Sequence, residues 1–237
     1  MDKKFRVFRN IGVNFVIVFM LGFLCVLTIN NDVRSVFNPS LANVVYRGNE
    51  SQNNVSLMIN VYWGNEYLPS MLKNFDNFGV KTTFFVGGMW VSKYPEELIN
   101  LSNKGHEIGN HGFFHKDHDK LNYQDNQKEI MNTHKLVKQY IGQEMTLFAP
   151  PSGAFNNDTL NSADDLGYQV IMWSRDTIDW RDQDANLIYE RATKKLSNGE
   201  LVLMHPTLKT AEALPRILQY CKDNNLNVVP VSSALLA

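Results

Sequence analysis

The sequence predicts an α/β domain built from parallel strands that alternate with helices. Seven apolar runs of strand length follow residue 54, and six segments with helical periodicity separate them. This alternation is typical of βα units, whose right-handed crossovers make neighbouring strands parallel. The sheet can close into a (β/α) barrel, and an open doubly wound sheet fits the same pattern. No glycine-rich phosphate loop follows the first strand, which disfavours a nucleotide-binding version of either fold.

The first half of the domain has clear start and stop signals. Residues 55–61 form an apolar run that predicts a strand. Residues 66–78 predict a helix, because apolar side chains recur at helical spacing and Gly79 follows them. Residues 81–86 predict the second strand. Residues 95–104 predict a helix that begins at a proline and stops before a glycine.

The remaining elements repeat this alternation to the end of the chain. Short apolar runs predict strands at residues 106–109, 145–149, 168–173, 200–204 and 227–231. Helical periodicity predicts helices at residues 123–141, 157–166, 185–196 and 209–223. We therefore expect one domain over residues 55–237.

The first thirty residues form a separate segment. Four basic residues precede a 19-residue apolar run: Lys3, Lys4, Arg6 and Arg9. The run is close to the roughly 20 residues that a helix needs to cross a bilayer core. A cleaved signal peptide is the alternative, but no small-residue cleavage site follows the run. We predict an uncleaved membrane anchor over residues 1–30.

The anchor and the charge balance together predict location and partners. Basic flanks stay on the cytoplasmic side, so we expect a single-pass protein of the cell membrane with its C-terminal domain outside the cell. Residues 31–54, rich in Asn and Ser, predict a linker. The net charge of −1 provides no basic field, so no nucleic acid partner is expected.

Cysteine usage limits the kind of metal site that the chain can form. The only cysteines are Cys25 and Cys221, and a disulfide between them is not expected because Cys25 lies in the apolar run. No Cys-x-x-Cys spacing occurs. Any metal would therefore be held by histidine and carboxylate.

Polar residues follow the predicted strands at the ends where parallel α/β folds place their sites. They are Asn60, Asn110, His111, His115, residues 150–153, Arg175, Asp176, Asp179, Trp180 and His205. Because the strands are parallel, we expect these positions to converge in space.

Histidines carry the strongest chemical signals. His111 and His115 are four residues apart and can share a cation, although two unrelated surface histidines would show the same spacing. His205 ends an apolar strand and is a candidate general acid, and a core histidine is the alternative. We expect His118 and His134 to be exposed.

Two further features belong to the same strand ends. Asp179 precedes Trp180, and its carboxylate could orient His205. Ser152 and Gly153 follow two prolines in a rigid loop, whose amides can serve as an oxyanion hole.

Taken together, these motifs resemble those of carbohydrate esterase family 4, the metal-dependent deacetylases of chitin and peptidoglycan. The similarity covers about residues 55–237, and residues 58–66 are most similar to the sporulation-associated branch of Gram-positive bacteria. The motifs that carry it are Lys81-Thr-Thr-Phe-Phe-Val86, Gly105-His-Glu-Ile-Gly-Asn-His111 with His115, Phe148-Ala-Pro-Pro-Ser-Gly153, Asp176-Thr-Ile-Asp-Trp180 and Leu203-Met-His205.

The resemblance implies a distorted (β/α) barrel of about seven parallel strands and hydrolysis of N-acetyl groups on cell-wall sugars. The family uses a divalent metal, often zinc, held by one aspartate and two histidines, with a second aspartate as base. By this resemblance His111 and His115 match the metal histidines and His205 matches the acid. The Ser152 amide matches the oxyanion donor.

The chain departs from the family at the end of its first strand. The family motif Thr-Phe-Asp-Asp-Gly reads Met58-Ile-Asn-Val-Tyr62 here. Asn60 then stands at the base and Val61 at the metal carboxylate. A register shifted to match Gly64 places Tyr62 and Trp63 there instead. An amide cannot accept a proton at neutral pH, and valine cannot bind a metal.

A second departure supports the first. The arginine that precedes Pro-Pro in the family, and supports its base, is Ala149 here. The missing carboxylate could come from Glu66, Asp176, Asp179 or a substrate group.

Two functions therefore follow from the sequence. The first is a metal-dependent deacetylase of cell-wall polysaccharide, weakened by the loss of its carboxylates. The alternative is a catalytically degenerate module that binds glycan or acts as a scaffold at the cell surface. Its sugar contacts would come from tryptophans that face the cleft: Trp63, Trp90, Trp173 or Trp180. Esterase action on O-acetyl groups is a third possibility.

Overall fold

The computed structural model describes Met20 and residues 44–236 of a chain that divides into two compact units, Met1–Ala42 and Asn43–Ala237. The predicted anchor, apart from Met20, and most of the predicted linker lie outside the described residues. Among the described residues, no helix is long and apolar enough to cross a membrane. The second unit carries the sheet and the candidate site.

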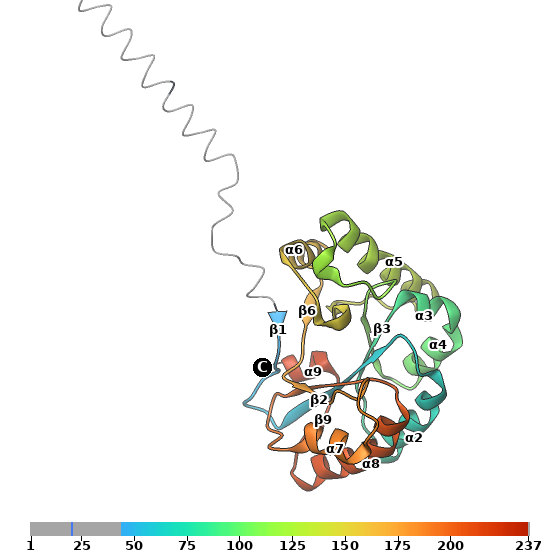
Figure 1. Cartoon of the computed structure of the whole chain (residues 1–237), viewed down its shortest axis with the longest axis vertical. Coiled ribbons are helices and arrows are strands. Elements are labelled where there is room, and N and C mark those ends of the chain that lie inside the picture. Colours follow the sequence, from blue (N-terminus) through green and yellow to red (C-terminus); the bar gives the residue numbers. More distant parts are fainter. Residues whose placement is uncertain (1–19, 21–43, 237) are drawn as a thin grey trace, which may run out of the picture. The chain divides into compact units, whose positions relative to one another are not determined.

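Nine strands within residues 44–236 form a curled sheet whose ladders are all parallel (Figure 1). Their spatial order is β1-β6-β5-β4-β3-β2-β8-β7, and β9 pairs with the start of β2. The strands are β1 (Val44–Val45), β2 (Asn54–Val61), β3 (Thr83–Val86), β4 (Glu107–Asn110), β5 (Leu147–Phe148), β6 (Gln169–Ile171), β7 (Arg175–Asp176), β8 (Leu201–Met204) and β9 (Asn227–Val228). The predicted parallel α/β class is confirmed, as a curled half-barrel.

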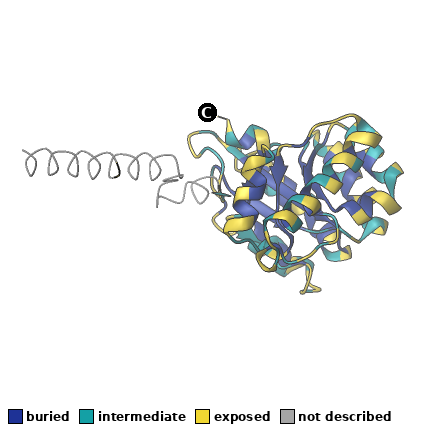
Figure 2. Cartoon of the chain, turned by 90° about the horizontal axis from the view of Figure 1, so that it is seen from above, coloured by how far each residue is buried: buried dark blue, intermediate teal, exposed yellow. Residues whose placement is uncertain are grey.

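Helices cover the outside of this sheet and turn their exposed faces to solvent (Figure 2). The α-helices of the described unit are α2 (Leu68–Phe78), α3 (Gly88–Lys93), α4 (Pro95–Asn103), α5 (Tyr123–Ile141), α6 (Asn157–Asp165), α7 (Ala185–Thr193), α8 (Leu208–Asp223) and α9 (Val231–Leu235). Short 3-10 turns are η2 (Asn65–Tyr67), η3 (His118–Lys120) and η4 (Pro151–Gly153).

The central strand β2 separates two hydrophobic cores. Leu57, Ile59 and Val61 belong to a large outer core between sheet and helices. Met58 belongs to a smaller inner core, because side chains alternate between the faces of a strand. The buried members of the inner core are Met58, Phe85, Leu147, Ala149, Ile171, Leu201, Leu203, Val231 and Ala234. The inner core is thus the lumen of the curled sheet.

Helix α9 closes one end of the inner core. Val231 and Ala234 pack into it, and the Val231 amide donates a hydrogen bond of 2.7 Å to Thr83 Oγ1 at the start of β3. The opposite end, where the strands have their carboxyl termini, is left for the site.

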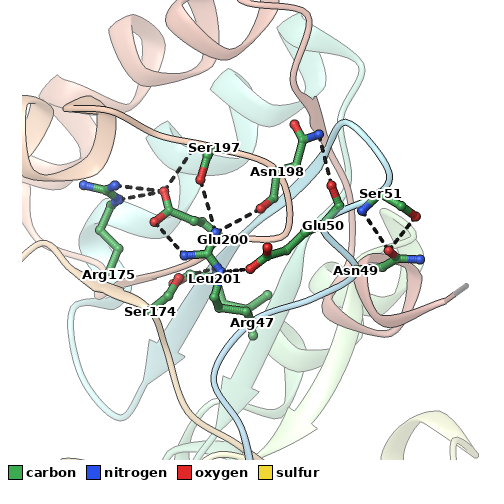
Figure 3. Close-up of polar contacts among 10 residues, drawn as sticks. All are labelled: Arg47, Asn49, Glu50, Ser51, Ser174, Arg175, Ser197, Asn198, Glu200 and Leu201. Atoms are coloured by element: carbon green, nitrogen blue, oxygen red, sulfur yellow. Dashed lines mark hydrogen bonds and ion pairs between the residues drawn. The ribbon is translucent and has the colours of Figure 1, made fainter.

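Residues 44–51 fasten the edges of the curled sheet to each other. Val44 and Val45 pair with β6, and Arg47 forms an antiparallel bridge with Glu200, just before β8. The buried Glu200 carboxylate forms ion pairs with Arg175 at 2.8 Å and with Arg47 at 3.4 Å. The three side chains are drawn in Figure 3. The part of the predicted linker that the structure describes therefore packs on the sheet.

Short elements were not predicted. Helices α3 and α9 have six and five residues and show too few turns for a periodic signal. The strand predicted over residues 227–231 ends at Val228, because Pro230 lacks the N–H that a ladder needs and caps α9 instead.

Candidate functional site

A cleft of about 560 Å³ opens at the carboxyl ends of the strands. It is lined by Asn60, Tyr62, Trp63, His111, His115, Ser152, Trp173, Asp176, Trp180, Leu203 and His205. Of the six residues predicted to have a catalytic or metal role, five line this cleft together: Asn60, His111, His115, Ser152 and His205. The sixth, Asp179, is fully buried and bonded to His205.

The cleft residues continue the inward-facing rows of the strands. Asn60 follows Met58 by two positions on β2, and His205, the residue directly after β8, follows Leu203 by two positions. A spacing of two keeps side chains on one face of a strand. In each case, the apolar side chain lies in the inner core, and the polar side chain two positions later on the same face lines the cleft.

His111 lies directly after β4 and is held in one tautomer. Its Nδ1 lies 2.7 Å from the carbonyl oxygen of Ala149, to which it donates, so its Nε2 carries the lone pair. Burial, reinforced by His115, holds the pKa of His111 well below its usual range. The ring is therefore neutral at physiological pH.

His115 adopts a left-handed backbone conformation, with φ of 54°. Its ring centroid lies 5.1 Å from that of His111, at an interplanar angle of 73°. The loop between them is fixed by Glu129 of α5, whose Oε2 accepts hydrogen bonds from the amides of Phe113 and Phe114 at 2.8 and 2.7 Å. Burial also lowers the pKa of His115.

His205 is held by Asp179 on two sides. Its Nδ1 lies 2.8 Å from Asp179 Oδ1, and its backbone amide donates to Asp179 Oδ2 at 2.6 Å. The Thr210 hydroxyl donates to the same Oδ2 at 2.5 Å. The arrangement fixes the orientation of the imidazole, as a positioned general acid or base requires.

Asn60 and Val61 face different parts of the molecule. Asn60 lines the cleft, is 3% exposed, and its Oδ1 accepts no hydrogen bond from the described residues. Val61 is fully buried in the outer core. Only Asn60 can therefore act on a ligand in the cleft.

Tyr62 and Trp63 each cover a different imidazole. The Tyr62 ring lies 4.9 Å from that of His115, and the Trp63 ring stacks on His205 at 5.9 Å, within 7° of parallel. Burial and the negative charge of Glu129 raise the pKa of Tyr62, so its phenol stays neutral.

Ser152 lies in η4 with a φ of 56°, between Pro151 and Gly153. This strained turn places Ser152 at the cleft. The position suits the oxyanion role that the resemblance implies.

The donors at the cleft do not fit a catalytic zinc site. Such a site takes three protein ligands and keeps one open position. Within the described residues, no group of three or more histidine, cysteine or acidic side chains could hold a metal ion. Asp176 lines the cleft, but its Oδ1 accepts a hydrogen bond from the Ile178 amide at 2.7 Å. Two neutral imidazoles remain.

Two expectations from the sequence were wrong. His118 is buried rather than exposed, because its Nδ1 bonds to Asn126 Oδ1 at 2.6 Å beneath the cleft loop. His134 is half-buried, between the Tyr168 hydroxyl and Glu144, both at 2.6 Å.

Among the tryptophans considered as sugar contacts, Trp63, Trp173 and Trp180 line the cleft. Trp90 lies in the outer core. Sequence reasoning did not single out Glu129 or Thr210. Neither residue belongs to a recognisable sequence motif. Glu129 contacts the loop amides of Phe113 and Phe114, and Thr210 contacts Asp179, and both contacts form only in the folded chain.

Comparison with known proteins decides the family. The model of the family described as polysaccharide deacetylase matches residues 47–171. The chain belongs to the polysaccharide deacetylase family. Among curated relatives, YlxY of Bacillus subtilis, an uncharacterized protein, is 38% identical over 179 residues, which are 76% of this chain and 56% of YlxY. The peptidoglycan-N-acetylmuramic acid deacetylase PdaA of the same species is 30% identical over 174 residues, 71% of this chain and 66% of PdaA.

A solved structure of the same family is similar in sequence and fold. It is BA3943 of Bacillus anthracis, a CE4 family pseudoenzyme, with 34% identity and a TM-score of 0.79 over 81% of this chain and 69% of that one. A BA3943 mutant with restored enzymatic activity is also similar to this chain, with 33% identity and a TM-score of 0.79. The match covers 81% of this chain and 71% of the mutant. The chain spans between about a third and two thirds of the length of the curated relatives that it matches first.

Proposed function

We propose that this chain binds N-acetylated cell-wall glycan of the peptidoglycan type in its cleft and does not hydrolyse it. The observation that carries this proposal lies at the end of β2. An amide, Asn60, stands where the resemblance places the family's base, and Val61 turns away into the outer core.

The relatives support each half of the proposal. PdaA and other similar proteins are named peptidoglycan deacetylases, which supports a peptidoglycan-type ligand. BA3943 is described as a pseudoenzyme, which supports loss of catalysis within this branch of the family.

The cleft offers groups that suit a sugar. Trp180 and Trp63 are 53% and 44% exposed, and their rings can stack on pyranose faces. Asn60 Oδ1 is a buried acceptor without a partner in the described structure, and an amide N–H of an N-acetyl group would satisfy it. Such a polar atom favours a ligand that brings a donor.

Binding to purified peptidoglycan and to N-acetylglucosamine oligomers tests the proposal. We expect binding that survives chelation by EDTA and falls when Trp180 is changed to alanine. The matched control is Tyr140→Ala on α5, an exposed aromatic that does not line the cleft. Absence of binding to both ligands, or equal loss in the control, would refute the proposal.

A second candidate is metal-dependent deacetylation of the same glycan. Two observations favour it: the Asp179–His205 pair and the lone pair on His111 Nε2. A divalent metal, zinc in the first instance, would need a carboxylate ligand beyond His111 and His115. Acetate release that depends on added zinc and on His205 would support this candidate.

Location and biological context belong to the proposal as well. We place the chain at the cell membrane, with residues 1–30 as a single-pass anchor and the glycan-binding domain outside the cell. Sporulation is the context that the resemblance suggests. Membrane fractionation of the full-length chain tests the anchor: release by high salt alone, without detergent, would rule it out.

A further inference from the structure

We propose that the Tyr62 ring excludes metal ions from the His111–His115 pair. The inference rests on the proposed function, since it explains how the cleft can retain two metal-type imidazoles and still work without a metal.

The direction of Tyr62 follows from the strand that precedes it. Asn60 faces the cleft and Val61 faces the outer core, so the next residue turns back to the cleft side. Tyr62 lines the same cleft as both imidazoles. The alternation of side chains along β2 therefore directs the Tyr62 ring into the cleft.

The ring is wedged between the backbone and a histidine. On one side a Cβ built on Gly87 would come within 2.3 Å of Tyr62 Cδ2, so the ring packs directly on the glycine at the end of β3. On the other side the His115 ring lies 4.9 Å away, centroid to centroid. Contact on both sides leaves the ring little freedom to swing out of the cleft.

The three rings lie in a row in which neighbouring rings touch but are not parallel, and the Tyr62 ring occupies the space beside His115. Tyr62 contacts His115, and His115 contacts His111 edge to face at 5.1 Å. A cation bound by two imidazoles also needs water or further ligands around it. Beside His115, carbon atoms of the Tyr62 ring take up space that those further ligands would need.

The test is zinc affinity of the full-length chain at pH 7.5, by competition with a chromogenic chelator. We expect Tyr62→Ala to bind zinc at least about tenfold more tightly than the wild type, a gain within the range of changes around a metal site. Tyr62→Phe keeps the ring and should match the wild type. His111→Ala combined with Tyr62→Ala should abolish the gain.

Each alternative outcome overturns the inference. No gain in folded Tyr62→Ala means that the ring does not exclude metal. A gain in Tyr62→Phe assigns the effect to the hydroxyl, and a loss there makes the phenol a ligand. If Tyr62→Ala does not fold, Tyr62→Leu is measured under the same criterion, with folding monitored by circular dichroism.

The same samples separate this inference from the proposed function. Glycan binding of the wild type is measured without metal. Absence of glycan binding by the wild type, together with a gain of zinc affinity in Tyr62→Ala, would refute the proposed function and leave the role of Tyr62 intact. Glycan binding by the wild type, with no gain of zinc affinity in Tyr62→Ala, would refute the role of Tyr62 and leave the proposed function intact.

Discussion

At the residue scale, Asn60 and Val61 are neighbours in sequence but not in environment. Alignment to the family motif assigns both to catalytic positions. The structure sends Asn60 to the cleft and Val61 to the outer core, because strand pairing continues through Val61, which aligns with Val86 of β3. An amide therefore stands in the cleft at the position that the resemblance gives to the base, and strand geometry turns the next side chain away from the cleft.

Substituting each position with aspartate separates the two environments. Val61→Asp buries a carboxyl group among apolar groups, and even in its protonated form this should lower the free energy of unfolding by roughly 2–7 kcal/mol. Asn60→Asp changes a side chain that already lines the cleft, so its loss should be smaller. Urea unfolding of both variants checks the order. Equal losses would show that Val61 does not face the core.

A second residue prediction concerns acid sensitivity. His106 is 3% exposed, and burial lowers its pKa to about 4. The unfolded chain then binds more protons between pH 6.5 and pH 4, so stability is lost as the pH falls through that window. A shift of this size should remove about 2 kcal/mol between pH 7 and pH 5.

The matched variant is His106→Gln, which cannot titrate in this range. Unfolding free energies of wild type and variant at pH 7 and pH 5 give the comparison. The variant should lose less stability on acidification, even if it is less stable at pH 7. An identical pH dependence in both would contradict the assignment.

At the element scale, α5 positions the loop that carries the two cleft histidines. Glu129 is buried, accepts from two successive loop amides, and pairs with Lys116 at 3.0 Å. Successive backbone amides form an anion-binding concavity. One carboxylate from a distant helix therefore fixes the left-handed turn at His115.

Removing that carboxylate should loosen the loop. Glu129→Ala leaves two amides without their acceptor and should cost about 1–3 kcal/mol of stability, together with glycan affinity. Glu129→Gln keeps an acceptor oxygen and should lose less. Lys116→Ala, which removes only the half-exposed partner, is the control. A control that loses as much as Glu129→Ala would assign the effect to the ion pair.

Elements with strong local signals could be predicted, and elements that depend on tertiary contacts could not. The helix over residues 123–141 has the same bounds in the structure, where Asn122 caps it and Gly142 ends it. In contrast, β7 has two residues and exists because it pairs with β8. Its sequence, Arg175-Asp176, carries no strand pattern.

At the scale of the whole molecule, a buried acid joins segments that are far apart in sequence. Glu200 accepts from Arg175, Arg47 and the Ser197 amide, and its side chain is 8% exposed (Figure 3). The contact ties the N-terminal segment of the unit to β7 and β8. It closes the curled sheet on the side opposite β3 and β4 in the strand order.

Breaking this junction should weaken the fold as a whole. Glu200→Ala leaves Arg175 partly buried without its partner and should cost about 3–5 kcal/mol. The control is Glu50→Ala, which removes the exposed partner of Arg47 and should cost less than about 1 kcal/mol. Thermal unfolding of both variants measures the difference. Similar losses would show that closure does not depend on the buried acid.

Much of the candidate site could be predicted because polar residues at strand ends stand out against apolar strands. His111, His115 and His205 were found in this way, and the cleft brings them together. The direction of each side chain could not be predicted. It depends on where β2 stops pairing, which decides that Tyr62 and not Val61 faces His115.

The central claim is that the cleft lacks the groups for metal-dependent hydrolysis. The most direct measurement is zinc content by mass spectrometry of metals together with acetate release from N-acetylglucosamine oligomers, on wild type and on His205→Ala. The account predicts far less than one zinc per wild-type chain and no acetate above the level of His205→Ala. One tightly bound zinc per chain, with acetate release that His205→Ala abolishes, would contradict it.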